Sequence, residues 1–190
     1  MTDWIARVHS AVKSSGRERE LVVRIPASID GCLSIGLDLR EWIRRGIVDV
    51  VVGNTFAGPE LIDPMADFRP LVEAAKGSDC RIHAAIHSLV DSDRLAHAPI
   101  EMVRATASNY WAQGIDGLYL AYWHGLWPFP ASFYEMLREL PDPEVMAPKD
   151  KYYHVLTQSG GFPEPTAEPG VTRQLPTDLK VSRPVQIHLV

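Results

Sequence analysis

Four runs of apolar residues that do not alternate with polar ones recur along the first 143 residues. They occupy residues 21–26, 48–52, 81–87 and 115–123. Apolar runs of this length are typical of strands buried on both faces, as in a parallel sheet. We therefore predict four strands, which start roughly 30 residues apart, the length of a strand–helix–strand unit.

Segments with apolar residues at helical spacing lie before, between and after these runs. The predicted helices cover residues 4–15, 38–46, 65–76, 99–113 and 132–140. The second has clear end signals, because Asp38 is a favoured N-cap, Glu41 completes a capping box and Gly46 follows the last turn. Strands that alternate with helices in this way form a parallel sheet through right-handed crossovers.

The number of units indicates an incomplete barrel. A complete (β/α)8 TIM barrel has eight strands in about 250 residues, so four units supply half of one. The predicted fold class is therefore α/β, a partial (β/α)8 TIM barrel, and we expect the chain to be a fragment. The first and fourth strands would each leave an unpaired edge, which folded proteins avoid. The other half could lie upstream of Met1, two copies could form a homodimer, or the sheet could be open.

The character of the sequence changes after Pro143. Residues 144–190 are rich in Pro and Thr, and residues 185–190 alternate between apolar and polar positions. Such alternation is typical of a strand with one exposed face. We predict that residues 1–143 form the half-barrel, and that residues 144–190 form an irregular linker and the start of a truncated β domain.

Charge and composition narrow the classes of partner. The 190 residues are 46% hydrophobic and carry a net charge of −5, which gives no reason to expect nucleic acid or an anionic membrane as partner. No apolar stretch approaches the ~18 residues of a membrane span, and charges interrupt the first residues too early for a secretory signal. The location is left open, with the cytoplasm as the default.

No cofactor or metal is expected. The sequence contains no Gly-rich phosphate loop, no G-x-S-x-G elbow and no C-x-x-C pair. Cys32 and Cys80 lack a paired spacing and are interpreted as buried free thiols. His83 and His87 have the H-x-x-x-H spacing of zinc helices, but four residues of a strand span about 13 Å, too far for one ion.

Several short motifs resemble a known family. They are R-I-P at 24–26, I-G-L-D at 35–38, W-x-x-x-G-x-V-D at 42–49 and G-I-D-G-L-Y-L at 114–120. These motifs are similar to those of uncharacterised bacterial barrel proteins related to glycosyl hydrolases, over residues 3–145. The resemblance implies that the four strands are the fifth to eighth of a glycosidase-type barrel and that the ligand is carbohydrate. It also implies an Asn–aromatic pair at the fourth strand mouth, where this chain has Tyr-Trp-His at 122–124.

Barrel enzymes bind substrate at the C-terminal ends of their strands, so residues there are the candidates. The predicted substrate-binding residues are Arg24, Asn54, His87, Trp123 and His124. The Arg24 guanidinium suits a carboxylate or a sugar hydroxyl, with a structural ion pair as the alternative. The Asn54 amide could bind a polyol or start a turn.

Aromatic rings and imidazoles cluster near these strand ends. Trp123, Trp127 and Phe129 could stack on a sugar ring or close the rim by packing. His87 and His124 could act as hydrogen-bonding or acid–base groups, with an exposed loop position as the alternative for His124.

Carboxylates are the missing component. Glycoside hydrolysis ordinarily needs two carboxyl groups about 5 to 10 Å apart, and no predicted strand ends on Asp or Glu. Asp49 and Asp116 stand at strand starts and are interpreted as structural. The remaining candidates lie in loops and are interpreted as caps or solvated charges: Asp30, Glu60, Asp91 and Asp93.

The sequence thus predicts a fragment of a glycoside-hydrolase-like barrel protein that acts on or binds carbohydrate, with its catalytic carboxylates in an absent N-terminal half. A noncatalytic carbohydrate-binding or assembly protein on a barrel scaffold is the alternative. A non-glycosidic hydrolase or lyase also stays open, because one fold hosts many chemistries. The catalytic residues are not identified.

Overall fold

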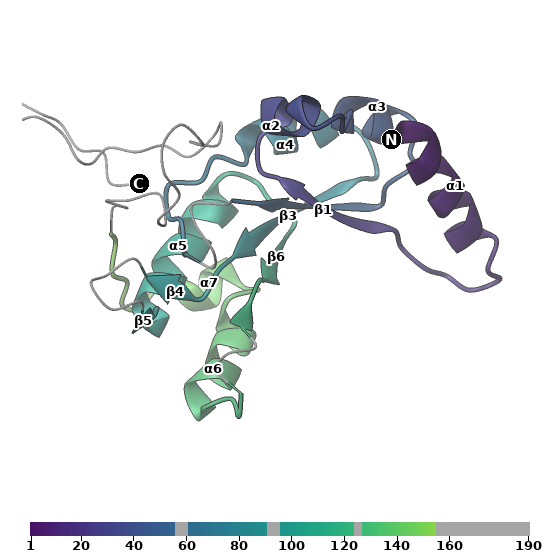
Figure 1. The fold of residues 1–190 in the computed structure, drawn as a ribbon. Coiled ribbons are helices and arrows are strands. Elements are labelled where there is room, and N and C mark those ends of the chain that lie inside the picture. Colours follow the sequence, from purple (N-terminus) through teal and green to yellow (C-terminus); the bar gives the residue numbers. More distant parts are fainter. Residues whose placement is uncertain (56–60, 91–95, 124–126, 155–190) are drawn as a thin grey trace, which may run out of the picture.

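A parallel four-stranded sheet forms the centre of the molecule. The computed structural model describes residues 1–55, 61–90, 96–123 and 127–154 (Figure 1). The strands are β1 (Val22–Pro26), β2 (Val50–Asn54), β3 (Arg81–Ile86) and β6 (Gly117–Leu120), in the order β1-β2-β3-β6. Every neighbouring pair is parallel, so the predicted α/β class and parallel strands are confirmed. The fourth strand is shorter than the apolar run that predicted it.

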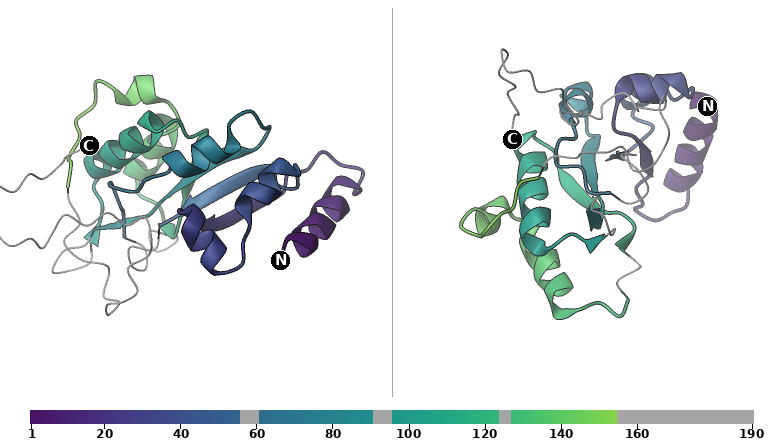
Figure 2. Two further views of the ribbon diagram at one scale, coloured as in Figure 1. Left: turned by 90° about the horizontal axis from the view of Figure 1, so that it is seen from above. Right: turned by 60° about the vertical axis from the view of Figure 1, so that its left-hand side comes forward.

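Helices follow each strand and precede the first. They are α1 (Thr2–Lys13), α2 (Ile29–Ser34), α3 (Leu39–Arg44), α4 (Arg69–Ala75), α5 (Ile100–Ala112), α6 (Ala131–Glu139) and α7 (Pro143–Met146). The views agree that α2, α3 and α4 lie along one face of the sheet (Figures 1 and 2). A short antiparallel pair, β4 (Leu89–Val90) and β5 (Ala96–His97), follows β3.

The helix boundaries confirm some end signals and correct others. The Asp38 side chain caps α3 by accepting from the Glu41 N–H at 3.1 Å. The helix predicted over 65–76 begins only at Arg69, because Asp63 accepts from the Met65 N–H and holds the preceding residues in a turn. Helix α2 was not predicted, and the Ser28 hydroxyl caps its start by accepting from the Gly31 N–H.

The two faces of the sheet differ. One set of strand residues, including Ile25, Val51 and Ile82, joins the main core with helix residues such as Trp42 and Leu71. The alternate residues Val50, Val52 and Ala85 form a separate small cluster with Ala121. A sheet with buried apolar residues on both faces is what non-alternating strands require.

Two aspartates tie the strand starts together. The Asp49 carboxylate accepts from the Leu21 N–H at 2.6 Å and pairs with Lys13 at 2.7 Å. The Asp116 carboxylate accepts from the Ile82 N–H at 2.7 Å. Both contacts cross between neighbouring strands, in keeping with the structural role predicted for these residues.

The C-terminal segment is described only in part. Helix α7 begins at Pro143 and extends into the predicted linker. Residues 155–190, with most of the predicted β domain, lie outside the described residues. Among the helices that are described, none has the length and apolar character needed to cross a bilayer.

Candidate functional site

The carboxyl ends of the four parallel strands bring together four side chains. Arg24 lies in β1, Asn54 ends β2, His87 follows β3 directly, and Tyr122 stands two residues after β6. Arg24 contacts Tyr122, Tyr122 stacks on His87, and His87 contacts Asn54. We call these four residues the strand-end cluster. Parallel strands place their carboxyl ends at one edge of the sheet, so a single site drawn from all four strands is a consequence of the topology.

Arg24 and Tyr122 form the exposed part of the cluster. The Arg24 Nη2 donates to the Tyr122 hydroxyl at 3.0 Å, and the guanidinium carbon lies 5.1 Å from the centre of the Tyr122 ring. Among the described residues Arg24 forms no ion pair with a carboxylate. The exposed guanidinium therefore keeps donors that can reach a ligand.

His87 and Asn54 form the buried part. The His87 ring stacks on Tyr122, with centroids 5.6 Å apart, and its Nε2 lies 3.2 Å from the Asn54 Oδ1. The Asn54 Nδ2 donates to the Thr55 carbonyl at 3.0 Å, so its Oδ1 is the acceptor and the His87 Nε2 carries the hydrogen. The His87 Nδ1 then holds a lone pair, and this buried atom has no partner among the described residues.

The imidazole of His87 is neutral at physiological pH. Burial, with a smaller contribution from the positive charge of Arg24, lowers its pKa from 6.5 to about 4. A neutral ring at this site offers one donor and one acceptor. Because the Nε2–H is directed at the Asn54 Oδ1, the Nδ1 lone pair is the group left to accept a hydrogen bond.

Tyr122 has a backbone conformation that requires explanation. Its φ is 59°, the left-handed region, which tyrosine rarely adopts. The Ser88 hydroxyl donates to the Tyr122 carbonyl at 3.3 Å. Conformations of this kind cost of order 1–3 kcal/mol and cluster at functional sites. Tyr122 was not among the predicted site residues. The one sequence signal at this position was that Tyr-Trp-His at 122–124 replaces the Asn–aromatic pair that the resemblance implies.

The other predicted aromatic residues lie elsewhere. The buried Trp123 indole donates to the Ile86 carbonyl at 3.0 Å and packs 5.9 Å from Phe133. Trp127 is exposed and contacts Phe129, which stacks on Phe133 with centroids 4.1 Å apart. Sugar stacking by Trp123 stays a prediction, and the rings give it a packing role in this structure. His124 lies outside the described residues.

His83, which was predicted to pack in the interior, is half-buried against β6. A Cβ added at Gly117 would come within 2.7 Å of the His83 Nε2, so the ring lies directly on the β6 backbone. Within the described ranges no group of three metal-ligating side chains comes together. Cys32 and Cys80 are buried free thiols, and burial raises the pKa of each to about 11.

One buried carboxylate stands outside the strand-end cluster. Asp63 is 1% exposed, its Oδ1 accepts from the Met65 N–H at 2.9 Å, and its backbone carbonyl accepts from the Tyr110 hydroxyl. Burial raises the pKa of Asp63 to about 6. These contacts place Asp63 in the packing of α5, where a large substrate has no access. Glu60, Asp91 and Asp93 lie outside the described residues.

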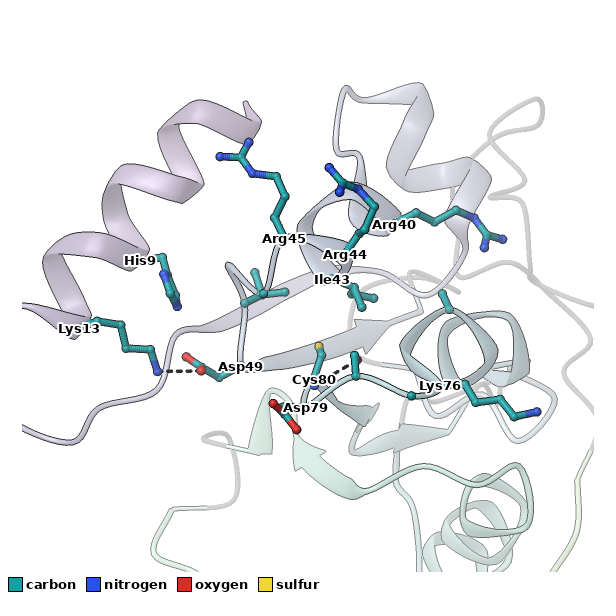
Figure 3. Close-up of a pocket in the computed structure, with 15 residues that line it drawn as sticks. His9, Lys13, Arg40, Ile43, Arg44, Arg45, Asp49, Lys76, Asp79 and Cys80 are labelled. Atoms are coloured by element: carbon teal, nitrogen blue, oxygen red, sulfur yellow. Dashed lines mark hydrogen bonds and ion pairs between the residues drawn. The ribbon is translucent and has the colours of Figure 1, made fainter.

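A cavity of about 710 Å3 lies away from the strand-end cluster, at the opposite ends of the strands (Figure 3). Cationic side chains dominate its lining: Lys13, Arg40, Arg44, Arg45 and Lys76. Carboxylates already pair with Lys13 at 2.7 Å, Arg44 at 2.8 Å and Lys76 at 3.5 Å. Arg44, Arg45 and Lys76 also lie at the C-terminal ends of α3 and α4, whose partial negative charge they offset. The strand-end cluster is therefore the stronger candidate.

The chain was compared with models of protein families and with curated proteins, and neither comparison produced a match. The functional interpretation of the strand-end cluster therefore depends on its own geometry.

Proposed function

We propose that this chain is half of a (β/α)8 barrel of the glycoside-hydrolase-like kind, and that its strand-end cluster binds carbohydrate. The observation that carries the proposal is the convergence of Arg24, Asn54, His87 and Tyr122 at the carboxyl ends of the sheet strands. Arg24 and Asn54 lie in β1 and β2, and His87 and Tyr122 follow β3 and β6. Barrels of this type bind their ligands at the carboxyl ends of their strands.

The strand order supports the barrel. Doubly wound sheets reverse their strand order at a switch point, whereas the order β1-β2-β3-β6 follows the chain without reversal. The small apolar cluster on the second face gives further support, because the inward residues of a barrel form a packed interior.

The chemistry of the cluster suits a neutral polyol. The Arg24 guanidinium supplies charged donors and the exposed Tyr122 ring supplies a flat face, while the buried His87 stacks on Tyr122 and contacts the buried Asn54. Sugars combine hydroxyl groups with an apolar C–H face, so a site with both kinds of group recognises them well.

Binding without hydrolysis is the second candidate. None of the four residues of the strand-end cluster is a carboxylate, whereas glycoside hydrolysis ordinarily uses two. Hydrolysis at this site would therefore need carboxylates from residues beyond the described part of the chain or from another polypeptide. Assays for bond cleavage and for binding separate the two candidates.

The test is calorimetric titration with neutral hexasaccharides of glucose, xylose and mannose, with release of reducing ends followed in parallel. Arg24→Ala is expected to weaken binding about 10- to 100-fold, since hydrogen bonds from a charged donor contribute about 1.5–3 kcal/mol. Tyr122→Phe, which releases Arg24 from its phenol partner, is expected to weaken binding about 3- to 10-fold.

Arg17→Ala, at an exposed arginine outside the sheet, is the matched control and is expected to bind like the unmodified chain. Equal affinities for Arg24→Ala and the control would contradict the proposal. So would the absence of binding to every sugar in the panel.

A further inference from the structure

Among the described strands, each outer strand of the sheet has a partner on one side only. Within the described residues β1 pairs only with β2, and β6 pairs only with β3. Each outer strand therefore presents a row of backbone N–H and C=O groups that no described strand satisfies. Exposed edges of this kind are templates for pairing with another chain.

Exposed apolar side chains mark the same two edges. Val22 of β1 is 52% exposed and Tyr119 of β6 is 42% exposed. In the register of the sheet Val22 pairs with Val50, and Tyr119 pairs with Ala85. Because paired residues of neighbouring strands share a face, Val22 and Tyr119 extend the small cluster of Val50 and Ala85 to both edges.

A hollow runs beside β6. This cavity, of about 360 Å3, is lined mainly by apolar side chains from β6, α5 and α6: Trp111, Leu118, Leu120, Leu137, Leu140 and Pro141. Leu137 is itself 44% exposed. The β6 edge thus combines backbone groups that no described strand pairs with and an apolar hollow.

We propose that a second copy of this chain covers both edges, with β1 of each copy pairing in parallel with β6 of the other. A twofold axis generates both β1–β6 junctions between the copies, which we call the seams. The resulting eight strands form a closed barrel with no unpaired outer strand. Val22 of one copy would then lie beside Tyr119 of the other, which completes the apolar interior at each seam.

This inference rests on the proposed half-barrel and adds a consequence for the ligand site. Closure brings two strand-end clusters to one mouth, with Arg24 of one copy beside Tyr122 of the other. The ligand site of a single copy is then half of the complete one. Sugar affinity is therefore expected to rise with protein concentration over the range in which the dimer forms.

The test is sedimentation velocity on the full chain from 1 to 100 µM. The unmodified chain is expected to sediment at twice its mass of 21.2 kDa. Tyr119→Asp and Val22→Asp, which place charges in the seams, are each expected to raise the dimer dissociation constant at least tenfold. Leu33→Asp, at an exposed leucine of α2, is the matched control and is expected to leave it unchanged.

Circular dichroism verifies that each variant folds. Hydrogen exchange of those β6 amides that do not bond to β3, compared at low and high concentration, gives a second measurement, with protection of these amides expected only in the dimer. A monomer at 100 µM would overturn the inference. So would an equal increase in the dimer dissociation constant for Tyr119→Asp and the control. A monomer that still binds sugar would leave the proposed function standing, and a dimer that binds none would remove the proposed function alone.

Discussion

Asp63→Asn and His87→Gln are expected to change the pH dependence of stability in opposite directions between pH 7 and pH 4. Asp63→Asn should make the free energy of unfolding fall more steeply as the pH drops. His87→Gln should make it fall less steeply or rise. Each difference is expected to reach about 3 kcal/mol, because each pKa is shifted by about two units and each unit is worth 1.36 kcal/mol.

The pKa of Asp63 is raised in the folded state and the pKa of His87 is lowered, so their contributions to stability change with pH in opposite directions. Burial raises the folded-state pKa of Asp63 to about 6, above its unfolded value of about 3.9. Asp63 therefore contributes stability that is fully present below pH 3.9 and lost as the pH rises through 6. Burial lowers the folded-state pKa of His87 to about 4, below its unfolded value of about 6.5. His87 contributes stability that is present above pH 6.5 and lost as the pH falls through 4.

The measurement is urea unfolding of both variants and the unmodified chain at unit intervals from pH 4 to pH 8. Asparagine keeps the acceptor for the Met65 N–H, and glutamine keeps a donor for Asn54, so packing changes little. Asp30→Asn, at an exposed carboxylate, is the control. If the free energy of unfolding of both variants changed with pH in parallel with that of the unmodified chain, neither group would titrate as its burial requires.

Phe68→Ala is expected to cost about 3–5 kcal/mol of stability, the range for removing a fully buried aromatic ring. The ring is 0% exposed and packs edge-on against Tyr110, with centroids 4.8 Å apart. A Cβ added at Gly53 would lie 3.0 Å from this ring and 2.8 Å from the Leu71 Cδ1, so Gly53→Ala alone is expected to cost about 1–3 kcal/mol.

The double variant provides the discriminating measurement. The methyl group of Gly53→Ala would enter the space that Phe68→Ala leaves, so the combined loss in urea unfolding is expected to be smaller than the sum of the single losses. Phe129→Ala, at a half-buried ring, is the control and is expected to cost less than Phe68→Ala. Additive losses would show that α4 does not pack on β2 at Gly53.

The local features of the fold were predictable because they depend on nearby residues. Apolar runs gave the four strands, and the capping residue Asp38 gave the start of α3. The start of α4 was not predictable in the same way. An Asp63-Pro64 pair is compatible with a helix that begins at once, and only the turn closed by the Met65 N–H delays it to Arg69.

The candidate site was predictable in part. Arg24, Asn54 and His87 follow from the rule that parallel strands present their ends together. Tyr122 does not, because nothing in an apolar run signals that a tyrosine will adopt a left-handed φ and turn toward Arg24. Trp123 is the reverse case. Trp123 was predicted as a ligand contact, but it is buried by contacts with Ile86 and Phe133. These residues lie outside its motif, so the motif alone could not predict the burial.

The most direct test of the strand-end cluster is an NMR titration of the 15N-labelled chain with the hexasaccharide that binds best in calorimetry. The expected result is a joint shift of the Arg24 Nε, Asn54 Nδ2, Ser88 and Tyr122 signals, all fitted by one dissociation constant, with the Arg40 Nε signal at the opposite end of the strands unchanged. Shifts confined to the cavity around Arg40 and Lys13, or the absence of shifts at Arg24 and Tyr122, would contradict a ligand site at the strand ends.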